Sequence, residues 1–143
     1  CLTLIEDAAE SLGTYYNGTH TGNYGRLAAL SFNGNKIVTT GGGGAVMTND
    51  PELGQRARHL TTTAKLPHAW EYDHDQVGYN YRMPNLNASL GCSQLNKLQK
   101  KLTLKREVAN LYENFFKNSD YIFIKEPSYA KSNYWLNAIL MPL

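Results

Sequence analysis

Short apolar runs separated by turn residues dominate the first 50 residues of the chain. Residues 2–5 and 27–32 are mostly apolar and are bounded by polar residues and glycines, a pattern that predicts short buried strands. Residues 45–48 follow four consecutive glycines and predict a third strand. Between the first two runs, residues 13–26 are rich in Gly, Asn, Thr and Tyr, and the pair Asn17-Gly18 predicts a turn within a loop or small hairpin.

The pattern becomes helical after residue 49. Asp50 is a preferred N-cap residue and Pro51 suits the first helical position, and an acidic residue follows in the first turn. Leu53, Ala57 and Leu60 recur at the spacing of one helix face. The sequence therefore predicts a helix that begins at residue 51.

A longer helical pattern runs from Asn85 to about Lys117. Its apolar residues recur at helical spacing in two sets, at positions 95, 98 and 102 and at positions 104, 108, 111 and 115. The basic side chains of this segment are interpreted as a solvated helix face. Beyond it, residues 121–124 and 133–141 predict two more strands, joined by a loop.

Residues 61–85 show no sustained periodicity, and a loop of this length is more than a connection. Its aromatic and charged side chains predict a binding surface or a subunit contact. His68 and His74, with Asp73 and Asp75, offer groups that bind metals, but their spacing matches no standard site. We therefore predict no metal centre.

The most unusual stretch is residues 31–44, in which Lys36 is followed closely by four glycines. Four glycines in a row lose much backbone entropy on ordering. A folded chain keeps them where the backbone must approach another group closely or adopt positive φ. This stretch alone leaves two interpretations open. It is either a glycine-rich hairpin with a solvated lysine at its tip, or a site that holds Lys36 as a nucleophilic amine.

Composition narrows the classes of partner. The chain has 143 residues and a net charge of +2, which is too small to argue for nucleic acid or an anionic membrane surface. It has no run of about 18 apolar residues, so no membrane span is predicted. Cys1 and Cys92 make no disulfide framework, which favours a cytoplasmic protein. Because both ends of the sequence fall inside apolar runs, we expect a fragment of a longer protein.

Three polar side chains follow the first two predicted strands: Asp7 follows the first, and Ser31 and Lys36 follow the second. Ligands of open α/β sheets bind beyond the carboxyl ends of strands, although Asp7 alone is more simply read as the cap of a following turn or helix. Together the three side chains meet the needs of pyridoxal phosphate, namely an amine for its aldehyde, a carboxylate for its ring nitrogen and a hydroxyl for its phosphate. Lys36 would also move the proton between substrate and cofactor.

Four motifs occur in one order along the chain. They are Glu6-Asp7-Ala8-Ala9-Glu10-Ser11-Leu12-Gly13, Ser31-Phe32-Asn33-Gly34-Asn35-Lys36, the glycines 41–44, and Gly78-Tyr79-Asn80-Tyr81-Arg82-Met83. In their order and spacing they resemble the sugar-nucleotide aminotransferases called DegT/DnrJ/StrS, over nearly the whole chain. The stretch 31–44 and residues 61–65 are most similar to the branch that aminates a 4-keto sugar nucleotide, as in legionaminic-type nonulosonic acid synthesis.

The resemblance implies an α/β fold that is part of the pyridoxal phosphate-dependent transferase fold type I. Its sheet would be mixed and mostly parallel, flanked by helices and incomplete at both ends. Residues 1–85 would be the C-terminal part of the large cofactor-binding domain, residues 86–118 a long connecting helix, and residues 119–143 the start of the small C-terminal domain. The family's early segment, which supplies further phosphate donors and a ring that stacks on the cofactor, is missing from this sequence.

The resemblance also implies a role for each matching residue. Lys36 would be the catalytic lysine that forms a Schiff base with the cofactor, Asp7 the partner of the ring nitrogen, and Glu10 a neighbour of the ring hydroxyl. Ser31 would bind the cofactor phosphate. In a homodimer with shared active sites, Asn80 would reach the phosphate of the neighbouring subunit's cofactor.

The function that follows is amino transfer, from glutamate, to a UDP-linked 4-keto-6-deoxy sugar in bacterial surface polysaccharide or nonulosonic acid biosynthesis. Asn33 and Arg82 are expected near this substrate. Two alternatives stay open: a non-catalytic truncated remnant of such an enzyme, and a phosphate-binding module without chemistry. Some relatives carry histidine in place of the lysine and act as dehydratases, which Lys36 argues against.

Overall fold

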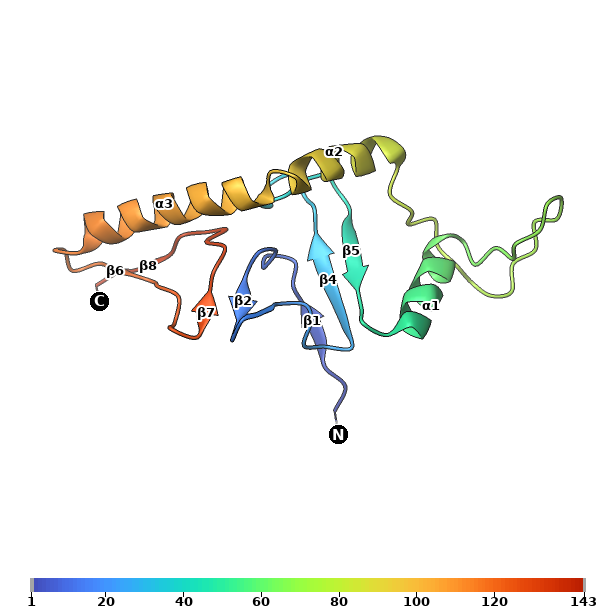
Figure 1. The fold of residues 1–143 in the computed structure, drawn as a ribbon, viewed down its shortest axis with the longest axis horizontal. Coiled ribbons are helices and arrows are strands. Elements are labelled where there is room, and N and C mark those ends of the chain that lie inside the picture. Colours follow the sequence, from blue (N-terminus) through green and yellow to red (C-terminus); the bar gives the residue numbers. More distant parts are fainter. Residues whose placement is uncertain (1, 143) are drawn as a thin grey trace.

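The computed structural model describes residues 2–142, which form a mixed α/β structure. The strands are β1 (Ile5–Asp7), β2 (Tyr15–Tyr16), β3 (Thr19–His20), β4 (Leu27–Ser31), β5 (Gly44–Met47), β6 (Ile122–Phe123), β7 (Ala130–Lys131) and β8 (Ile139–Leu140), and the helices are α1 (Pro51–Thr61), α2 (Asn85–Leu95) and α3 (Leu98–Phe116). In Figure 1, α2 and α3 run along the top, the strands lie below them, and α1 lies at one side. The predicted α/β class is confirmed, but the expectation of mostly parallel strands is not met within residues 2–142, where β1–β4 is parallel and the other strand pairs are antiparallel.

The sheet that carries the predicted site has the strand order β1-β4-β5. Strand β1 is parallel to β4, with Asp7 opposite Ala29, and β4 is antiparallel to β5, with Ser31 opposite Gly44. The carboxyl ends of β1 and β4 therefore lie side by side, at the same end of the strands. The chain segments that follow these two strands start from this end.

A second sheet joins distant parts of the chain. Strands β2 and β3 form the predicted hairpin, in which Asn17 and Gly18 both adopt positive φ, of 45° and 80°, as its tight turn requires. Strand β7 pairs with β2, so that Tyr15 lies opposite Lys131. Strands β6 and β8 form a third, two-stranded sheet.

The first predicted strand is shifted and is not buried. It covers Ile5–Asp7 rather than residues 2–5, and Leu2 and Ile5 are 99% and 66% exposed. Strand β1 lies at the edge of its sheet, and no other strand among residues 2–142 pairs with its outer side. The other two predicted strands, over 27–32 and 45–48, are confirmed as β4 and β5.

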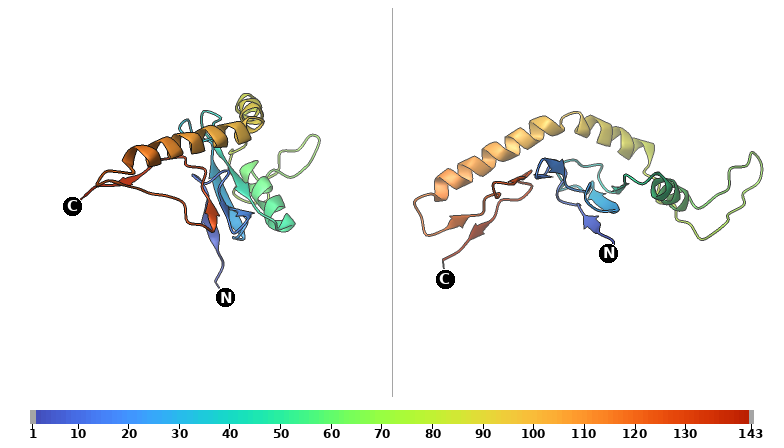
Figure 2. Two further views of the ribbon diagram at one scale, coloured as in Figure 1. Left: turned by 60° about the vertical axis from the view of Figure 1, so that its left-hand side comes forward. Right: turned by 60° about the horizontal axis from the view of Figure 1, so that its bottom comes forward.

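The first helix is confirmed, with Asp50 as its N-cap. The Asp50 carboxylate accepts hydrogen bonds from the backbone N–H groups of Glu52 (3.0 Å) and Leu53 (3.2 Å). The second helical segment differs from the prediction, because the expected long helix over 86–118 is two helices, α2 and α3. They meet at Asn96 and Lys97, where the axis changes direction (Figure 2). Helical periodicity is continuous across such a bend, so the sequence pattern does not reveal it.

The C-terminal strands are shorter than predicted. Residues 121–124 contain β6, but of residues 133–141 only Ile139–Leu140 is strand. Tyr134 has a φ of 46°, which breaks the extended conformation. The polar groups of Asn133 and Trp135 make other contacts, described below, instead of strand pairs.

The core gathers around the segment that follows Lys36. Val38 and Thr40 are each only 1% exposed, and Ala28 of β4 and Leu102 of α3 are also buried. Because these side chains are packed, the turn that carries Lys36 is anchored rather than free.

The segment between α1 and α2 projects as an arm on the side of α1, and it has neither helix nor long strand (Figures 1 and 2). Its two halves are joined by isolated β-bridges, Thr62 with Asn80 and Lys65 with His74. Trp70, on this arm, is 86% exposed. The arm matches the predicted long loop, and its role as a subunit contact stays a prediction.

Candidate functional site

Lys36 lies in a tight turn at the carboxyl end of β4. Its backbone N–H donates a 3.1 Å hydrogen bond to the carbonyl oxygen of Asn33, and the loop closes where Phe32 N–H bonds to Gly43 (2.9 Å). The Lys36 side chain is only 13% exposed. The interpretation of Lys36 as a solvated side chain at a hairpin tip is therefore wrong.

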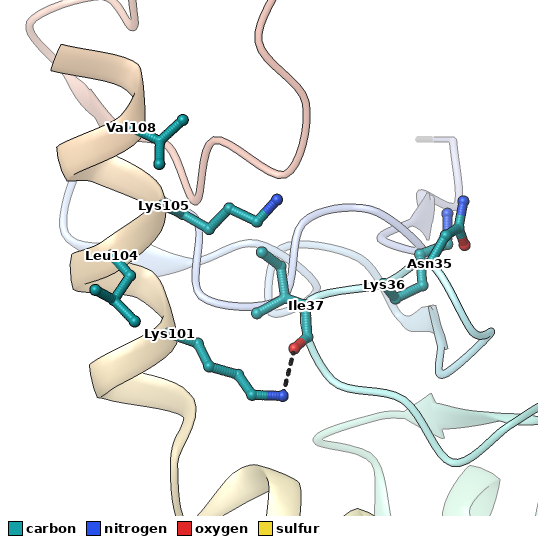
Figure 3. A pocket seen from close by; sticks show the side chains of 7 residues that line it. All are labelled: Asn35, Lys36, Ile37, Lys101, Leu104, Lys105 and Val108. Carbon is teal, nitrogen blue, oxygen red and sulfur yellow. Dashed lines mark hydrogen bonds between the residues drawn. The ribbon is translucent and has the colours of Figure 1, made fainter. Parts of the chain in front are cut away.

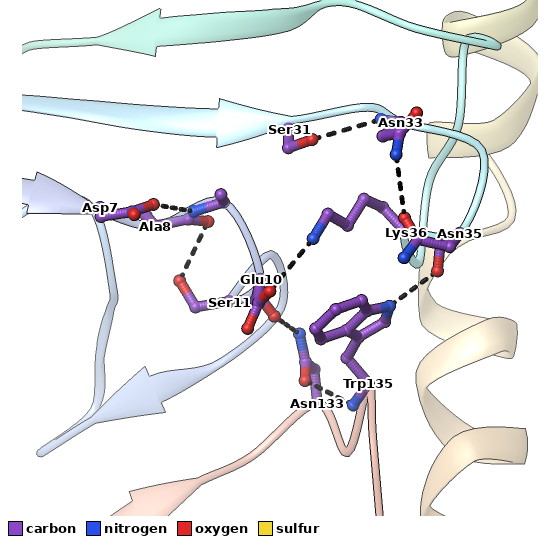
Figure 4. Close-up of polar contacts among 11 residues, drawn as sticks. Asp7, Ala8, Glu10, Ser11, Ser31, Asn33, Asn35, Lys36, Asn133 and Trp135 are labelled. Atoms are coloured by element: carbon purple, nitrogen blue, oxygen red, sulfur yellow. Dashed lines mark hydrogen bonds and ion pairs between the residues drawn. The ribbon is translucent and has the colours of Figure 1, made fainter.

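The amine of Lys36 lies between a carboxylate and an aromatic ring (Figure 4). Its Nζ is 3.3 Å from Oε1 of Glu10 and 3.9 Å from the centroid of the Trp135 ring. Glu10, Ser31, Lys36 and Trp135 line the same narrow crevice, which is too small for a water molecule. The structure thus brings three of the predicted residues together and adds Trp135, which the sequence analysis missed.

Asp7 and Asn33 flank this group. Asp7 Oδ1 accepts a 3.1 Å hydrogen bond from Ala9 N–H, so Asp7 does cap the turn that follows β1. Its other carboxylate oxygen makes no hydrogen bond to residues 2–142, which leaves it free for a ligand. The Ser31 hydroxyl oxygen accepts a 3.3 Å hydrogen bond from Asn33 N–H, and the Asn33 side chain bonds to Asn35 (3.3 Å).

The glycine run is required at three of its four positions. Gly41 and Gly43 have φ angles of 81° and 89°, which other residues rarely adopt. A Cβ on Gly44 would lie 2.2 Å from the carbonyl oxygen of Leu30 in the paired strand, whereas one on Gly42 would meet nothing within 4 Å. The sequence-based expectation of positive φ and close backbone approach is confirmed.

Both long helices hold the Lys36 segment from behind. The Asn87 side chain of α2 donates a 2.6 Å hydrogen bond to the Thr40 carbonyl. Lys101 of α3 donates a 3.1 Å hydrogen bond to the Ile37 carbonyl, in a cavity of about 320 Å³ (Figure 3). Lys101 belongs to the basic face that the sequence analysis interpreted as solvated, and at this position that interpretation is wrong.

Asn133 was also missed, although a polar residue within an expected apolar strand was a signal for it. Its side chain is 4% exposed in a C-terminal segment and bonds to the carbonyls of Glu10 (2.7 Å) and Leu12 (3.0 Å). Trp135 follows two residues later. The segment 133–135 therefore closes the site from the far end of the chain.

Asn80 and Arg82 lie elsewhere, at the base of the arm. They line a cavity of about 400 Å³ together with the glycines 42–44 and Asn87. Among the described residues, no hydrogen bond joins either side chain to the group around Lys36. The predicted site residues thus form two groups, one around Lys36 and one at the cavity that the glycines 42–44 help to line.

Glu6, next to Asp7, fixes the loop beside β1. Its carboxylate accepts hydrogen bonds from the backbone N–H groups of Gly22 (2.7 Å), Tyr24 (2.7 Å) and Gly25 (2.5 Å). Burial acts to raise the pKa of Glu6, but these hydrogen bonds together outweigh it and the pKa is lowered. Glu6 is therefore held as an anion in a structural role, which leaves Asp7 to meet a ligand.

The donor set fits pyridoxal phosphate. Lys36 offers a mostly covered amine beside a carboxylate, Ser31 lines the same narrow crevice, and the Asp7 carboxylate lies at the same end of the strands. These are the amine, hydroxyl and carboxylate that the aldehyde, the phosphate and the ring nitrogen require. Among residues 2–142, no cluster of three or more His, Cys, Asp or Glu side chains could hold a metal ion.

Within the same described range, no helix has both the length and the apolar character that crossing a membrane requires.

His68 and His74, which the sequence analysis considered as metal ligands, each contact backbone groups of their own loop. His74 Nδ1 lies 2.7 Å from the Thr63 carbonyl, and His68 Nδ1 accepts hydrogen bonds from Trp70 (3.3 Å) and Glu71 (3.0 Å) N–H groups.

Comparison with known proteins agrees with this geometry. The chain is 41% identical over 139 residues to EpsN of Bacillus subtilis (strain 168), provisionally named a pyridoxal phosphate-dependent aminotransferase, in an alignment that covers 96% of this chain and 36% of that protein. It is 40% identical to the GDP-perosamine synthase of Escherichia coli O157:H7, covering 97% of this chain and 38% of that enzyme. The chain thus spans a little over a third of these relatives' length.

A solved structure gives the same result. Helicobacter pylori PseC, an aminotransferase involved in the biosynthesis of pseudoaminic acid, superposes with a TM-score of 0.91 at 29% identity, over 99% of this chain and 38% of PseC. The profile of the DegT/DnrJ/EryC1/StrS aminotransferase family matches residues 1–142. The resemblance found in the four motifs is confirmed, and the chain belongs to the DegT/DnrJ/EryC1/StrS aminotransferase family.

Proposed function

We propose that the protein is a pyridoxal phosphate-dependent aminotransferase of the cytoplasm that transfers an amino group from glutamate to a keto sugar nucleotide. The proposed acceptor is a UDP-linked 4-keto-6-deoxy sugar, used in surface polysaccharide or nonulosonic acid biosynthesis. The observation that carries the proposal is the covered amine of Lys36, held between Glu10 and Trp135 in a narrow crevice that Lys36 and Ser31 line together.

The names of relatives support the acceptor class. One relative, 34% identical over 142 residues, is a UDP-4-amino-4,6-dideoxy-N-acetyl-beta-L-altrosamine transaminase of Campylobacter jejuni, and others are GDP-perosamine synthases. All these names describe amino sugars linked to nucleotides. The choice of UDP and of the 4-keto position is part of the proposal.

Each residue has a defined task in this function. Pyridoxal phosphate, when bound, supplies an aldehyde that accepts the amino group and a ring that takes up the electrons released when a proton leaves the substrate carbon. Asp7 would keep the proton on the ring nitrogen, and the Ser31 hydroxyl would donate a hydrogen bond to the phosphate. Lys36 Nζ would bind the cofactor at rest and then carry the proton between carbon atoms.

Glu10 would act beside Lys36. Its carboxylate, 3.3 Å from Nζ, attracts the amine while the lysine is not bonded to the cofactor, and it would lie near the ring hydroxyl. The donor and the acceptor would use the same site in turn, so glutamate would leave as its keto acid before the sugar nucleotide enters. Asn33 and Arg82 would contact the sugar nucleotide.

We also propose a homodimer with shared active sites. Asn80 is exposed and lies in a cavity apart from Lys36, as expected if it reaches the phosphate of the cofactor in a neighbouring subunit. The projecting arm, with Trp70 86% exposed, is the proposed subunit contact.

The first test is a titration of the intact protein with pyridoxal phosphate, followed by borohydride reduction and mass spectrometry. We expect a new visible absorption band and a reduced adduct on Lys36, and neither in Lys36→Ala. The Lys100→Ala variant is the matched control, because Lys100 is an exposed lysine of the neighbouring helix α3. No band in a folded sample would contradict the proposal and favour a remnant or a phosphate-binding module.

The second test uses two inactive variants. Lys36→Ala and Asn80→Ala are each expected to abolish turnover of a keto sugar nucleotide with glutamate. If the sites are shared, a mixed dimer of the two contains one site with both wild-type residues. Mixing should then restore activity to at most about a quarter of the wild-type value, whereas sites built within one subunit would stay inactive.

A further inference from the structure

Trp135 lies against the amine of Lys36, and a hydrogen bond holds its ring. The Lys36 Nζ lies 3.9 Å from the ring centroid. The indole Nε1–H donates a 2.7 Å hydrogen bond to the carbonyl oxygen of Asn35, the residue before Lys36 (Figure 4). The face of an indole attracts a cation, and this attraction grows when water is excluded.

The backbone around Trp135 is equally well held. The Trp135 N–H donates a 2.8 Å hydrogen bond to the Asn133 side chain, and Lys105 of α3 donates a 3.1 Å hydrogen bond to the Trp135 carbonyl. Asn133 is in turn buried against the turn that carries Glu10. Rotation of the indole away from Lys36 would break its hydrogen bond to Asn35, and movement of the Trp135 backbone would break the hydrogen bonds to Asn133 and Lys105.

The two groups around the Lys36 amine differ in their access to water. The Glu10 side chain is 62% exposed, so water screens its attraction for the amine. The Lys36 side chain is only 13% exposed, and Trp135 is the aromatic ring that contacts its amine. The indole ring thus covers one side of the Lys36 amine.

We infer that Trp135 is a positioning residue for Lys36, an inference that rests on the proposed function. The indole holds the Lys36 side chain in the narrow crevice that Lys36 and Ser31 line together, and it limits the orientations open to the amine. Lys36 then condenses faster with an aldehyde at this place, a step that forms one C=N bond and releases one water molecule. The C-terminal segment thereby contributes to the group around Lys36, to which Glu10 and Ser31 also belong.

The experiment compares two ligands. Pyridoxal phosphate bonds to Lys36, whereas pyridoxamine phosphate shares its ring and phosphate but has no aldehyde. A residue that acts through Lys36 should therefore affect only the first ligand. In the intact protein, we expect Trp135→Leu to slow the appearance of the visible band with pyridoxal phosphate by about tenfold. We expect the affinity for pyridoxamine phosphate to change less than about twofold.

Two further variants sharpen the test. Trp135→Phe keeps an aromatic face and should recover most of the rate, although it loses the hydrogen bond to Asn35. Phe115→Leu also replaces an aromatic ring by leucine, at a residue of α3 that is 79% exposed, and should alter neither measurement. An unchanged rate in Trp135→Leu, or an equal loss for both ligands, would overturn the inference.

The proposed function can fail separately. If the folded wild-type protein forms no visible band, the cofactor assignment is wrong and the inference falls with it. If the band forms on Lys36 at the same rate in Trp135→Leu and in the wild type, only the role of Trp135 is wrong.

Discussion

The side-chain amide of Asn87 donates a 2.6 Å hydrogen bond to the carbonyl oxygen of Thr40. This contact joins the second helix to the segment between Lys36 and the glycines. Thr40 is 1% exposed, so its carbonyl has little access to water. Gly91, one turn further along α2, allows the approach, since a Cβ there would lie 2.9 Å from the Thr40 methyl group. The position of the Lys36 turn therefore depends on a helix that carries no predicted catalytic group.

Removing this hydrogen bond should weaken the fold measurably. We expect Asn87→Ala to lower the free energy of unfolding by about 1–3 kcal/mol, because it leaves a buried carbonyl without its partner. Denaturant unfolding monitored by circular dichroism measures the change. Ser89→Ala, on the exposed side of the same helix, should alter stability by less than about 0.5 kcal/mol. Equal values for the two variants would show that the Thr40 carbonyl does not need Asn87.

The glycine run offers an internal comparison between adjacent residues. Gly44→Ala would place a Cβ 2.2 Å from the Leu30 carbonyl and should force β4 and β5 apart, with a loss of about 3 kcal/mol or more. Gly42→Ala meets open space and should change stability by less than about 1 kcal/mol. Thermal unfolding of the two variants tests the pair, and a severe effect of Gly42→Ala would contradict the described geometry.

Asn133→Asp tests the contact between the two ends of the chain. The substitution keeps the shape but replaces a donor by an acceptor that faces the carbonyls of Glu10 and Leu12. We expect a loss of about 3 kcal/mol in the free energy of unfolding. The matched control is Asn110→Asp, at an exposed position of α3, which should change stability little. Comparable losses in both variants would mean that the charge, and not the lost donor, destabilises the protein.

The ion pair between Arg106 and Glu126 predicts a pH dependence. The Arg106 guanidinium, which donates hydrogen bonds to Glu126, lowers the pKa of Glu126 against the opposing effect of burial, and the Ser132 N–H adds to the lowering. A carboxyl group whose pKa is lowered by folding stabilises the folded state when the pH is above the ordinary pKa of the group, which is 4.5 for Glu126. That stabilisation is lost as the pH falls through the folded-state pKa.

The stability difference between wild type and Glu126→Gln should therefore be present at pH 7, on the order of 1 kcal/mol, and shrink toward pH 3. Denaturant unfolding at several pH values measures it. Glu107→Gln, at an exposed position of α3, should show no such trend. A difference that grows on acidification would have the wrong sign for this mechanism.

Local chemistry made much of the site predictable. Asp50 and Pro51 predict the start of α1, because helix capping depends on residues that are neighbours in the sequence. The glycines after Lys36 are likewise predictable, because positive φ angles favour glycine. The bend at Asn96 could not be predicted, because the direction of a helix axis depends on what supports each half. Here α2 contacts the Thr40 segment, and α3 packs Leu102 against Gly13, just before the β2–β3 hairpin.

The role of residues 133–135 could not be read from the sequence for a similar reason. An apolar, aromatic stretch predicts a strand when its partners are other strands. The partners of Asn133 and Trp135 are the Glu10 turn and the Lys36 turn, which lie far away in the sequence. Only the folded chain shows that the polar groups of this stretch point toward the site.

This distance has a consequence for the order in which the protein is made. Asn133 and Glu10 are 123 residues apart, and Trp135 and Asn35 are 100 residues apart. A ribosome adds about 5–20 residues per second, so Glu10 waits for several seconds or more before its partner is synthesised. During that time the nascent chain can form the β1-β4-β5 sheet, but the Trp135 ring that packs beside Lys36 has not yet been synthesised. The covered setting of Lys36 is therefore completed only after residues 133–135 have been synthesised.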